Sequence, residues 1–264
     1  MIGGWWLVMN VDMHNKLKEI IQSLKIWENH DLLWLPTTTS TNDDIKAIWH
    51  NDNFCPIIEV ADTQTKGKGQ YERKWASSSI GQCLMFSFSI DIKEFEFPVS
   101  MIAGIALAIA LEELGVSKSD FWLKWPNDIW LNNKKLSGIL TESTTINHGL
   151  RSVVGIGINI LPLPDKSINA ISLSEYNIHV TREEVLIAFL KAFDKIFHLS
   201  ASKLSELWNN YASNFKKIKC KIQILNEPAF IATALGVSND GSLMVEKTNG
   251  EKRKIISATL TPII

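Results

Sequence analysis

The sequence predicts an α+β domain followed by a small all-β barrel. Through most of the 264 residues, apolar runs with helical spacing are interspersed with short apolar runs typical of strands. From Lys216 onward the pattern changes to short strand-like runs separated by turns. Asn239-Asp240-Gly241 and Asn249-Gly250 are strong hairpin-turn signals. A C-terminal stretch of about fifty residues with this pattern is typical of a small barrel.

The first elements follow from periodicity and from helix-boundary signals. Thr41 with Asp44 three residues later is a capping-box variant, which predicts that a short helix begins there. Over residues 83–90, apolar side chains alternate with Ser87 and Ser89, which predicts a strand buried on one face only. In chain order we expect a helix over 17–27, a strand over 32–35, a helix over 41–49, a strand over 56–60, a long loop over 61–79 and a strand over 83–90.

The middle of the chain contains the most apolar segment. Residues 99–114 predict a buried central helix that ends at Gly115. Residues 132–134 form a turn between two strands, and Thr181 with Glu184 is a second capping box. The remaining strands are expected over 121–125, 129–131, 136–142, 153–160, 219–225, 229–237, 242–247 and 252–257, and the remaining helices from 181 towards 198 and over 202–213.

Composition excludes several classes of function. Lys and Arg number 27 against 28 Asp and Glu, so the formal net charge of −1 gives no global reason to expect nucleic-acid or membrane partners. Three widely spaced cysteines without ligand spacing argue against a disulfide framework or a zinc site, which suits the cytoplasm. Residues 1–11 are apolar but lack the basic start of a signal peptide, so we expect a poorly ordered extension. The ten tryptophans are unusually many, and some are expected to line a pocket or an interface.

The loop over residues 61–75 is the first segment whose residues could bind a ligand. Gly67-Lys68-Gly69 offers close backbone approach and positive charge, which together suit an anion, and Trp75 can stack on a purine. Taken alone, the loop is better explained as a solvated basic loop, because short Gly/Lys patterns are common.

The segment Lys124-Trp125-Pro126-Asn127-Asp128 is the second. An unpaired ammonium in an apolar strand is costly, so Lys124 must pair with a carboxylate such as Asp128, reach solvent or bind an anion. A purely structural ion pair is the alternative. Lys135, in Lys135-Leu136-Ser137-Gly138, is by itself best explained as an exposed residue of a hairpin.

Two further segments are ambiguous alone. Gly155 and Gly157 lie inside an apolar strand, which indicates either the close approach of a ligand or packing against the central helix. Ser40-Thr41-Asn42 places hydroxyl and amide groups at a helix start, where simple capping is the alternative.

In order and spacing, these segments together resemble the biotin–protein ligases, that is, the biotin–[acetyl-CoA-carboxylase] ligases. The resemblance runs from about residue 32 to the C-terminus, and Lys124-Trp125-Pro126-Asn127-Asp128 with the downstream Lys135–Leu140 segment is its most specific part. It implies a class II synthetase-like mixed sheet over 31–215 and an SH3-like barrel over 216–264, after an N-terminal extension and helix over 1–30.

The resemblance implies a two-step ligase that uses ATP with Mg²⁺ and has biotin as its substrate. Biotinyl-5′-AMP forms first, and a lysine of the biotin carboxyl carrier domain of acetyl-CoA carboxylase then takes the biotin. Lys135 is expected to bridge the biotin carboxylate and the α-phosphate, and Asp128 is a candidate Mg²⁺ ligand, with the other ligands unassigned. The catalytic residues implied are Lys135, Arg73 and Lys68; the biotin-binding residues are Ser40, Thr41, Asn42, Gln64, Gly67, Lys68, Gly69, Lys135, Gly138, Gly155 and Gly157; the ATP-binding residues are Gln70, Arg73, Trp75, Lys124, Asn127 and Asn159.

The glycine loop departs from the family pattern, which usually reads GRGRxGR. Lys68 replaces an arginine and loses bidentate geometry, Gln70 loses a charge, and Glu72 adds a negative charge where the family has glycine. We therefore expect weaker retention of the adenylate.

Three alternatives follow from the resemblance. The upstream stretch has one clear helix, too little for the winged-helix domain of repressor-type members, so a ligase without repressor function is expected. A lipoate–protein ligase and a non-catalytic biotin sensor are the other functions considered. Some relatives dimerise edge to edge through the sheet, which leaves homodimer formation open.

Overall fold

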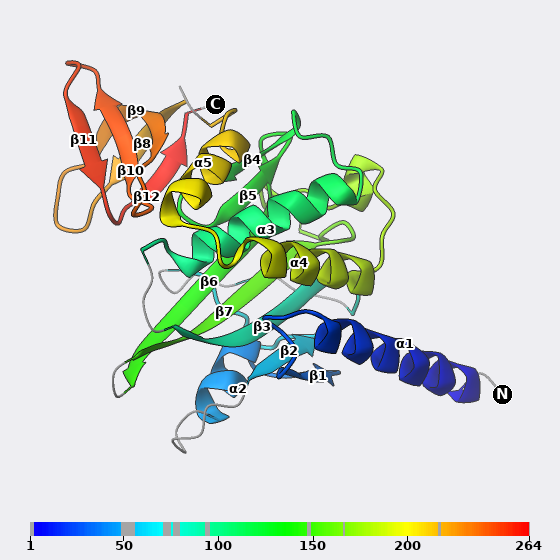
Figure 1. Ribbon diagram of the computed structural model, residues 1–264. Coiled ribbons are helices and arrows are strands. Elements are labelled where there is room, and N and C mark those ends of the chain that lie inside the picture. The colour runs from blue at the N-terminus through cyan, green and yellow to red at the C-terminus, as the bar shows by residue number, and fades with distance from the viewer. Residues whose placement is uncertain are drawn as a thin grey trace.

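A mixed seven-stranded sheet forms the larger part of the protein (Figure 1). The computed structural model describes residues 3–48, 56–70, 75, 80–92, 96–146, 149–165, 167–215 and 218–263. The strand order is β1-β2-β3-β7-β6-β5-β4, with β1 and β2 parallel and the other neighbours antiparallel. The strands are β1 Asp31–Leu35, β2 Ile57–Ala61, β3 Cys83–Ile92, β4 Phe121–Lys124, β5 Asp128–Leu131, β6 Lys134–Ile146 and β7 Gly149–Asn159.

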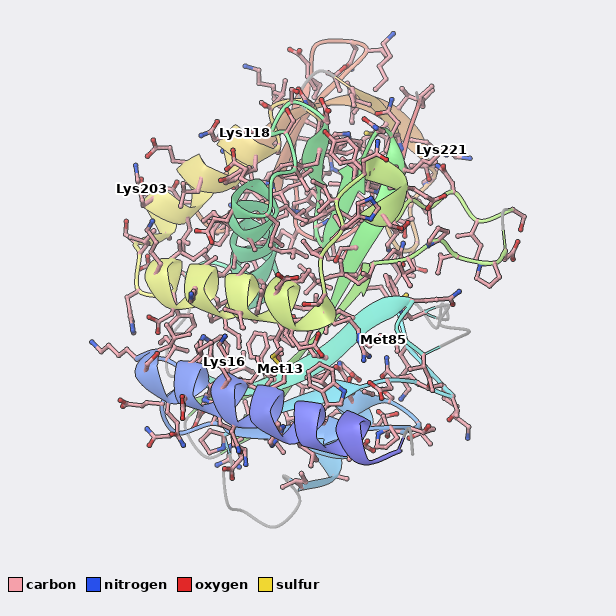
Figure 2. All side chains as sticks on the ribbon, turned by 90° about the vertical axis from the view of Figure 1, so that its right-hand side faces the viewer. Met13, Lys16, Met85, Lys118, Lys203 and Lys221 are labelled. Atoms are coloured by element: carbon pink, nitrogen blue, oxygen red, sulfur yellow. The ribbon has the colours of Figure 1, made fainter. Side chains whose placement is uncertain are left out.

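Helices cover both faces of this sheet. On one face, α3 (Val99–Glu113) and α4 (Arg182–Ile196) pack side by side over the centre of the sheet, α5 (Ala201–Tyr211) packs against α3, and α1 (Gly3–Ser23) lies beside α4 (Figures 1 and 2). On the other face, α2 (Thr41–Ile48) packs against β2, β3 and β7, with Ile45 buried against Ile57 and Val153. A short 3₁₀ helix, η3 (Ser174–Tyr176), follows β7.

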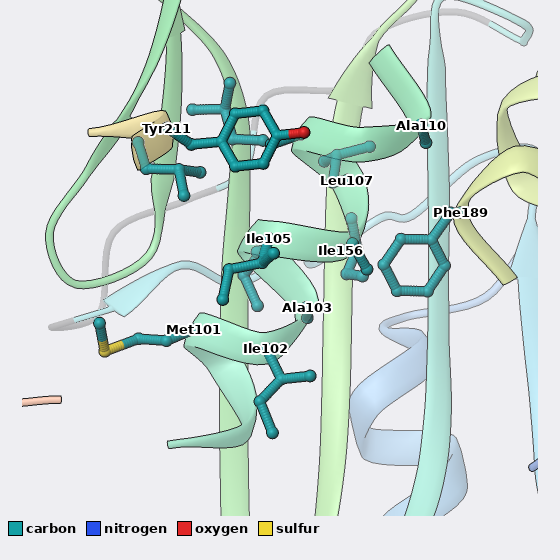
Figure 3. Packing of buried hydrophobic residues seen from close by; sticks show 14 of the residues in the cluster. Met101, Ile102, Ala103, Ile105, Leu107, Ala110, Ile156, Phe189 and Tyr211 are labelled. Carbon is teal, nitrogen blue, oxygen red and sulfur yellow. The ribbon is translucent and has the colours of Figure 1, made fainter. Parts of the chain in front are cut away.

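The predicted central helix is confirmed as α3, and Gly115 follows its end with a φ of 95°. It is apolar on all sides because it lies between the sheet and two other helices (Figure 3). Ile156 of the sheet and Phe189 of α4 lie to one side of α3, and Tyr211 of α5 lies to the other. Gly104 lets α5 approach closely, since a Cβ there would lie 3.0 Å from the Trp208 ring.

The N-terminal helix differs from the expected 17–27 segment at both ends. Its backbone is helical from Gly3, so the expectation of a poorly ordered extension over 1–11 is wrong for residues 3–11. It stops at Ser23, whose hydroxyl donates to the carbonyl of Ile20 at 2.6 Å and so competes with the helical backbone bonds. Trp27 lies in the turns that follow and is fully buried, with its indole N–H donating to the carbonyl of Leu190 at 2.9 Å.

Strand β3 is buried on both faces, which corrects the half-buried strand expected from its alternation. Phe86 and Phe88 face α4, and Ser87 and Ser89 face α2 with no exposed surface. The Ser89 hydroxyl accepts from the backbone N–H of Ile57 at 2.9 Å, and Ser87 bonds to side chains described below. The two serines therefore lie in a polar layer between the sheet and α2, and not on a face of β3 that is exposed to solvent.

Two of the predicted turn and cap signals form in the structure, and a third does not. The capping box at α4 is confirmed, with the Thr181 hydroxyl accepting from the N–H of Glu184 and the Glu184 carboxylate accepting from the N–H of Thr181. The β5–β6 turn consists of Asn132 and Asn133, with φ of 48° and 60°, and Lys134 already belongs to β6. The capping box predicted at Thr41 and Asp44 does not form, because the Asp44 carboxylate accepts from Thr38 instead.

The chain ends in a five-stranded antiparallel sheet in the order β11-β10-β9-β8-β12, which confirms the predicted small barrel (Figure 1). Its fifth strand was not predicted. The barrel is joined to the larger sheet by Trp125, whose indole N–H donates to the carbonyl of Gly241 at 2.9 Å. The strands are β8 Lys219–Gln223, β9 Phe230–Val237, β10 Leu243–Lys247, β11 Lys252–Ile255 and β12 Thr259–Pro262. Of the helices in the described ranges, none combines the length and hydropathy needed to span a bilayer.

Candidate functional site

Two adjoining cavities lie on the face of the sheet opposite α3 and α4. The larger has a volume of about 330 Å³ and is bounded by both the sheet and the barrel. The smaller, of about 60 Å³, lies between α2, β3, β6 and β7. Five residues line both cavities and so form their common boundary: Gly69, Gln70, Trp75, Asn127 and Lys135.

Nearly all the residues implied by the resemblance meet at these cavities, although they come from five separate segments of the chain. Arg73 lies outside the described residues. Gly67 lines neither cavity but lets the loop approach Trp75, whose backbone N–H donates to the Gly67 carbonyl at 3.0 Å. Lining the smaller cavity are Ser40, Thr41, Asn42, Gln64, Lys68, Gly138, Gly155 and Gly157, and lining the larger are Lys124 and Asn159.

A cluster of two lysines and one aspartate stands at the boundary. The Asp128 carboxylate lies 2.7 Å from the Lys135 ammonium and 3.2 Å from that of Lys124. Burial works to raise the pKa of Asp128, but the adjacent Lys135 and Lys124 charges outweigh it and hold the pKa below its usual value. The cluster therefore carries a net positive charge beside both cavities. The structural ion pair considered for Lys124 is thus present.

Trp75 lies over the strand glycines at the same boundary. A Cβ on Gly157 would overlap the indole ring, and one on Gly138 would lie 3.2 Å from it. The Lys135 ammonium lies 5.8 Å from the centre of the ring. The missing side chains of Gly138 and Gly157 thus make room for Trp75, which corrects the alternative that Gly157 packs against the central helix.

Polar side chains around the smaller cavity bond mainly to one another. The Thr41 hydroxyl lies 2.5 Å from that of Ser87, and the Thr41 N–H donates to Gln64 Oε1 at 2.9 Å. Asn42 accepts from Ser87 at 2.6 Å and donates to Glu142 at 2.8 Å. Ser87 and Glu142 were missed in the sequence.

The rim of the smaller cavity is tied to α2 by ion pairs. Lys68 of the glycine loop lies 2.6 Å from Asp43, which also accepts Lys46 at 3.0 Å. Lys46 in turn pairs with Glu142 at 2.5 Å. The Asp43 carboxylate was also missed, and it partly neutralises the lysine that the resemblance placed near phosphate.

A pair of carboxyl groups lies between β2 and α2. Glu59 of β2 is 1% exposed and hydrogen-bonds to Asp44 of α2. Burial, with a smaller contribution from Asp44, raises the pKa of Glu59 to about 8. At neutral pH the Glu59 carboxyl is therefore protonated and can donate to its neighbour.

The larger cavity has one charged side and one apolar side. Leu163, Ile168 and Ala170 come from the loop after β7, and this loop is held beside β6 by the N–H of Lys135, which donates to the carbonyl of Asn169 at 3.1 Å. Across the cavity stand Ala258, Thr259 and Leu260 of the barrel. A flat apolar group with an attached anion suits such a cavity.

The two amides implied in nucleotide binding are already engaged. Asn127 donates to the carbonyl of Ile139 at 2.7 Å. Asn159 is 2% exposed and donates to the carbonyl of Ile171 at 3.1 Å. Both side chains therefore hold the walls of the larger cavity in place.

The donor set does not fit a resident divalent cation. Within the described ranges, no three His, Cys, Asp or Glu side chains gather closely enough to hold a metal ion. Asp128, the candidate ligand, already accepts from two ammonium groups. A cation at this site would be held mainly by a phosphate ligand.

Comparison with known proteins gives consistent matches. Residues 34–159 match the model of the "Biotin/lipoate A/B protein ligase family". Biotin--protein ligase 2 of Arabidopsis thaliana is 32% identical over 179 residues, covering 64% of this chain. The bifunctional ligase/repressor BirA of Bacillus subtilis is 32% identical over 246 residues, covering 88% of this chain and 72% of the relative. The chain spans about half the length of the Arabidopsis relatives, 53% in the first case.

Among solved structures, the biotin protein ligase from Aquifex aeolicus in complex with biotin and ATP superposes with a TM-score of 0.72. It is 31% identical and covers 88% of this chain and 99% of its own. Together with the mixed seven-stranded sheet and the five-stranded antiparallel sheet, this likeness confirms the expected α+β architecture with a small C-terminal barrel.

Proposed function

Because this chain belongs to the biotin/lipoate A/B protein ligase family, we propose that it is an ATP-dependent biotin–protein ligase. In the first step, a biotin carboxylate oxygen attacks the α-phosphorus of ATP, and the bond to the β-phosphate oxygen breaks to release pyrophosphate. In the second, a lysine amine of an acceptor protein attacks the acyl carbon of biotinyl-5′-AMP. AMP leaves, and the amine gives up a proton as the amide forms.

The position of Lys135 carries this proposal. Its ammonium stands at the common boundary of a small polar cavity and a larger cavity with an apolar side. A neutral ureido ring suits the hydroxyls and amides of the smaller cavity, and a nucleotide suits the larger. The carboxylate of one ligand and the phosphate of the other would then meet beside Lys135.

Electrostatic positioning is what this site offers to the reaction. A carboxylate approaching a triphosphate is repelled, and a fixed cation between them offsets the repulsion as the new bond forms. Asp128 holds the Lys135 ammonium at 2.7 Å and Lys124 adds a second charge. Lys68 extends the positive charge to the loop, and a ligand anion would compete with Asp43 for it.

Mg²⁺ is proposed to enter with ATP as part of the substrate and not as a resident ion. The acceptor is proposed to be the lysine of a biotin carboxyl carrier domain of acetyl-CoA carboxylase. That choice rests on the family resemblance.

Intact-mass analysis tests the proposal. The purified protein is incubated with MgATP, a biotin carrier domain and either biotin or lipoate, and we expect the carrier to gain one biotinyl group. Lys135→Met is expected to slow adenylate formation by about 10²–10³-fold, as for other fixed groups that stabilise developing charge. Lys134→Met is the matched control, because Lys134 is exposed and lines neither cavity.

Other outcomes would replace the proposal. Transfer of lipoate alone would identify a lipoate–protein ligase. Tight biotin binding without adenylate or transfer would identify a biotin sensor.

A further inference from the structure

A chain of hydrogen bonds connects Glu142 on β6 to the smaller cavity. Glu142 accepts from Asn42 Nδ2 at 2.8 Å, and Asn42 Oδ1 accepts from the Ser87 hydroxyl at 2.6 Å. The Ser87 and Thr41 hydroxyl oxygens lie 2.5 Å apart. Asn42, Ser87 and Thr41 all line the cavity and are at most 4% exposed, so bulk water does not compete for these bonds.

The direction of every proton in this chain follows from its charged end. The Glu142 carboxylate, paired with Lys46, only accepts, so Asn42 must turn its amide N–H₂ towards it and its oxygen towards Ser87. Ser87 uses its single proton on that oxygen, so the proton between the two hydroxyls belongs to Thr41.

Thr41 therefore has no proton left for a ligand. Its hydroxyl also lies 3.4 Å from Gln64 Oε1, but that oxygen receives the backbone N–H of Thr41 at 2.9 Å, and the one hydroxyl proton is taken by Ser87. Towards the cavity, Thr41 Oγ1 is an acceptor only.

Gly155 keeps this arrangement in place. A Cβ at this position would overlap the Asn42 side-chain oxygen and approach the Ser87 hydroxyl at 3.2 Å. The glycine thus leaves room for the Asn42 amide between Ser87 and Glu142, where the bond direction is set.

We propose that Glu142 is a positioning residue that makes the smaller cavity selective for a ligand with an N–H donor, by fixing the Thr41 hydroxyl as an acceptor. A cyclic urea offers such a donor, whereas a dithiolane ring does not. The inference rests on the proposed function and explains, through the direction of one hydrogen bond, how the site distinguishes biotin from lipoate.

Glu142→Gln reverses the chain. Lys46 attracts the new amide oxygen, so the amide N–H₂ faces Asn42, which must turn its own oxygen towards it. Asn42 then donates to Ser87, Ser87 donates to Thr41, and Thr41 directs its proton into the cavity. The variant therefore prefers a ligand acceptor where the natural protein prefers a donor.

The probes are biotin and the two cyclic carbamates in which one or the other ureido N–H is replaced by oxygen. Calorimetry gives the three dissociation constants. We expect the natural protein to bind biotin about tenfold more tightly than the carbamate whose oxygen faces Thr41, since two acceptors then oppose each other. In Glu142→Gln the ratio of the affinity for biotin to the affinity for this carbamate falls to about one or below.

Two further variants separate this from other effects. Lys46→Met removes the ion pair to Glu142 but leaves a carboxylate to accept from Asn42, so the affinity ratio is expected to stay at the natural value. Ser87→Ala breaks the chain, frees the Thr41 proton and is expected to lower the ratio, which provides the answer if Glu142→Gln does not fold.

The outcomes distinguish this inference from the proposed function. Unchanged ratios in Glu142→Gln and Ser87→Ala, with tight biotin binding by the natural protein, would overturn the positioning role alone. A changed ratio in Lys46→Met equal to that in Glu142→Gln would assign the effect to the ion pair and also overturn it. Absence of biotin binding by the natural protein would reject the function itself.

Discussion

Glu59 allows a sharp test of the buried polar layer beneath α2. Its carboxyl is 1% exposed, hydrogen-bonds to Asp44 and has a pKa raised to about 8, against a reference value of 4.5. Between these two values the folded protein binds a proton that the unfolded chain has lost. Stability from this group is therefore complete below about pH 4.5 and declines as the pH rises towards 8.

Glu59→Gln removes the titration and keeps the geometry, because an amide N–H₂ can donate to Asp44 as the protonated acid does. With 1.36 kcal/mol per pH unit, the natural protein should lose about 2.5 kcal/mol of unfolding free energy relative to the variant between pH 5 and pH 7. Other titrating groups are common to both proteins and cancel in the comparison.

Urea unfolding followed by tryptophan fluorescence at pH 5, 6 and 7 measures this difference. Glu206→Gln is the matched control, because the Glu206 side chain is 69% exposed and the same charge is removed at the surface. Its profile should run parallel to that of the natural protein. If the unfolding free energy of Glu59→Gln also ran parallel to that of the natural protein between pH 5 and pH 7, Glu59 would be ionised in the folded protein and the reasoning would be refuted.

Three other changes test the site. Gly157→Ala puts a methyl group into the Trp75 ring, and we expect a loss of about 1–3 kcal/mol in urea unfolding with altered tryptophan emission. Asp128→Asn leaves two ammonium groups around a neutral amide and should cost about 3–5 kcal/mol at pH 7. Because the pKa of Asp128 is lowered, that difference should shrink as the pH falls through the acid range; a constant difference would argue against the ion pairs. Gln70→Arg adds a cation between the cavities and should slow release of biotinyl-5′-AMP by roughly tenfold in a dissociation assay; an unchanged rate would show that position 70 does not reach the phosphate.

Periodicity predicted most elements because it reports which faces are apolar. It failed at Ser87 and Ser89 because alternation does not distinguish a polar face in water from one covered by a helix. Strand β12 was missed for a different reason. It is an edge strand, where Pro262 is tolerated, and Leu260 is its only buried residue.

The sequence predicted the site residues that belong to motifs lining the cavities. It did not predict residues such as Glu142, which act by positioning another side chain. Lys124, Asp128 and Lys135 come from one hairpin region, where the sequence already made Asp128 a candidate partner of Lys124 but did not predict its pairing with Lys135. Glu142 lies in a strand with no special neighbours, and its contact with Asn42 joins positions 100 residues apart. Such a contact depends on the register of β6 beside β7 and α2, which is set by tertiary packing and leaves no local signal.

The bond between Trp125 and Gly241 has a thermodynamic consequence. The larger cavity has walls from both the sheet and the barrel, so a ligand that touches both binds best when the two are docked. By linkage, such a ligand must tighten the docking by the same factor by which docking tightens the ligand. Ligand binding in the cavity and docking of the barrel are then one coupled equilibrium. A change at residue 241 that weakens the docking would therefore lower the affinity for the ligand, although residue 241 does not line the cavity.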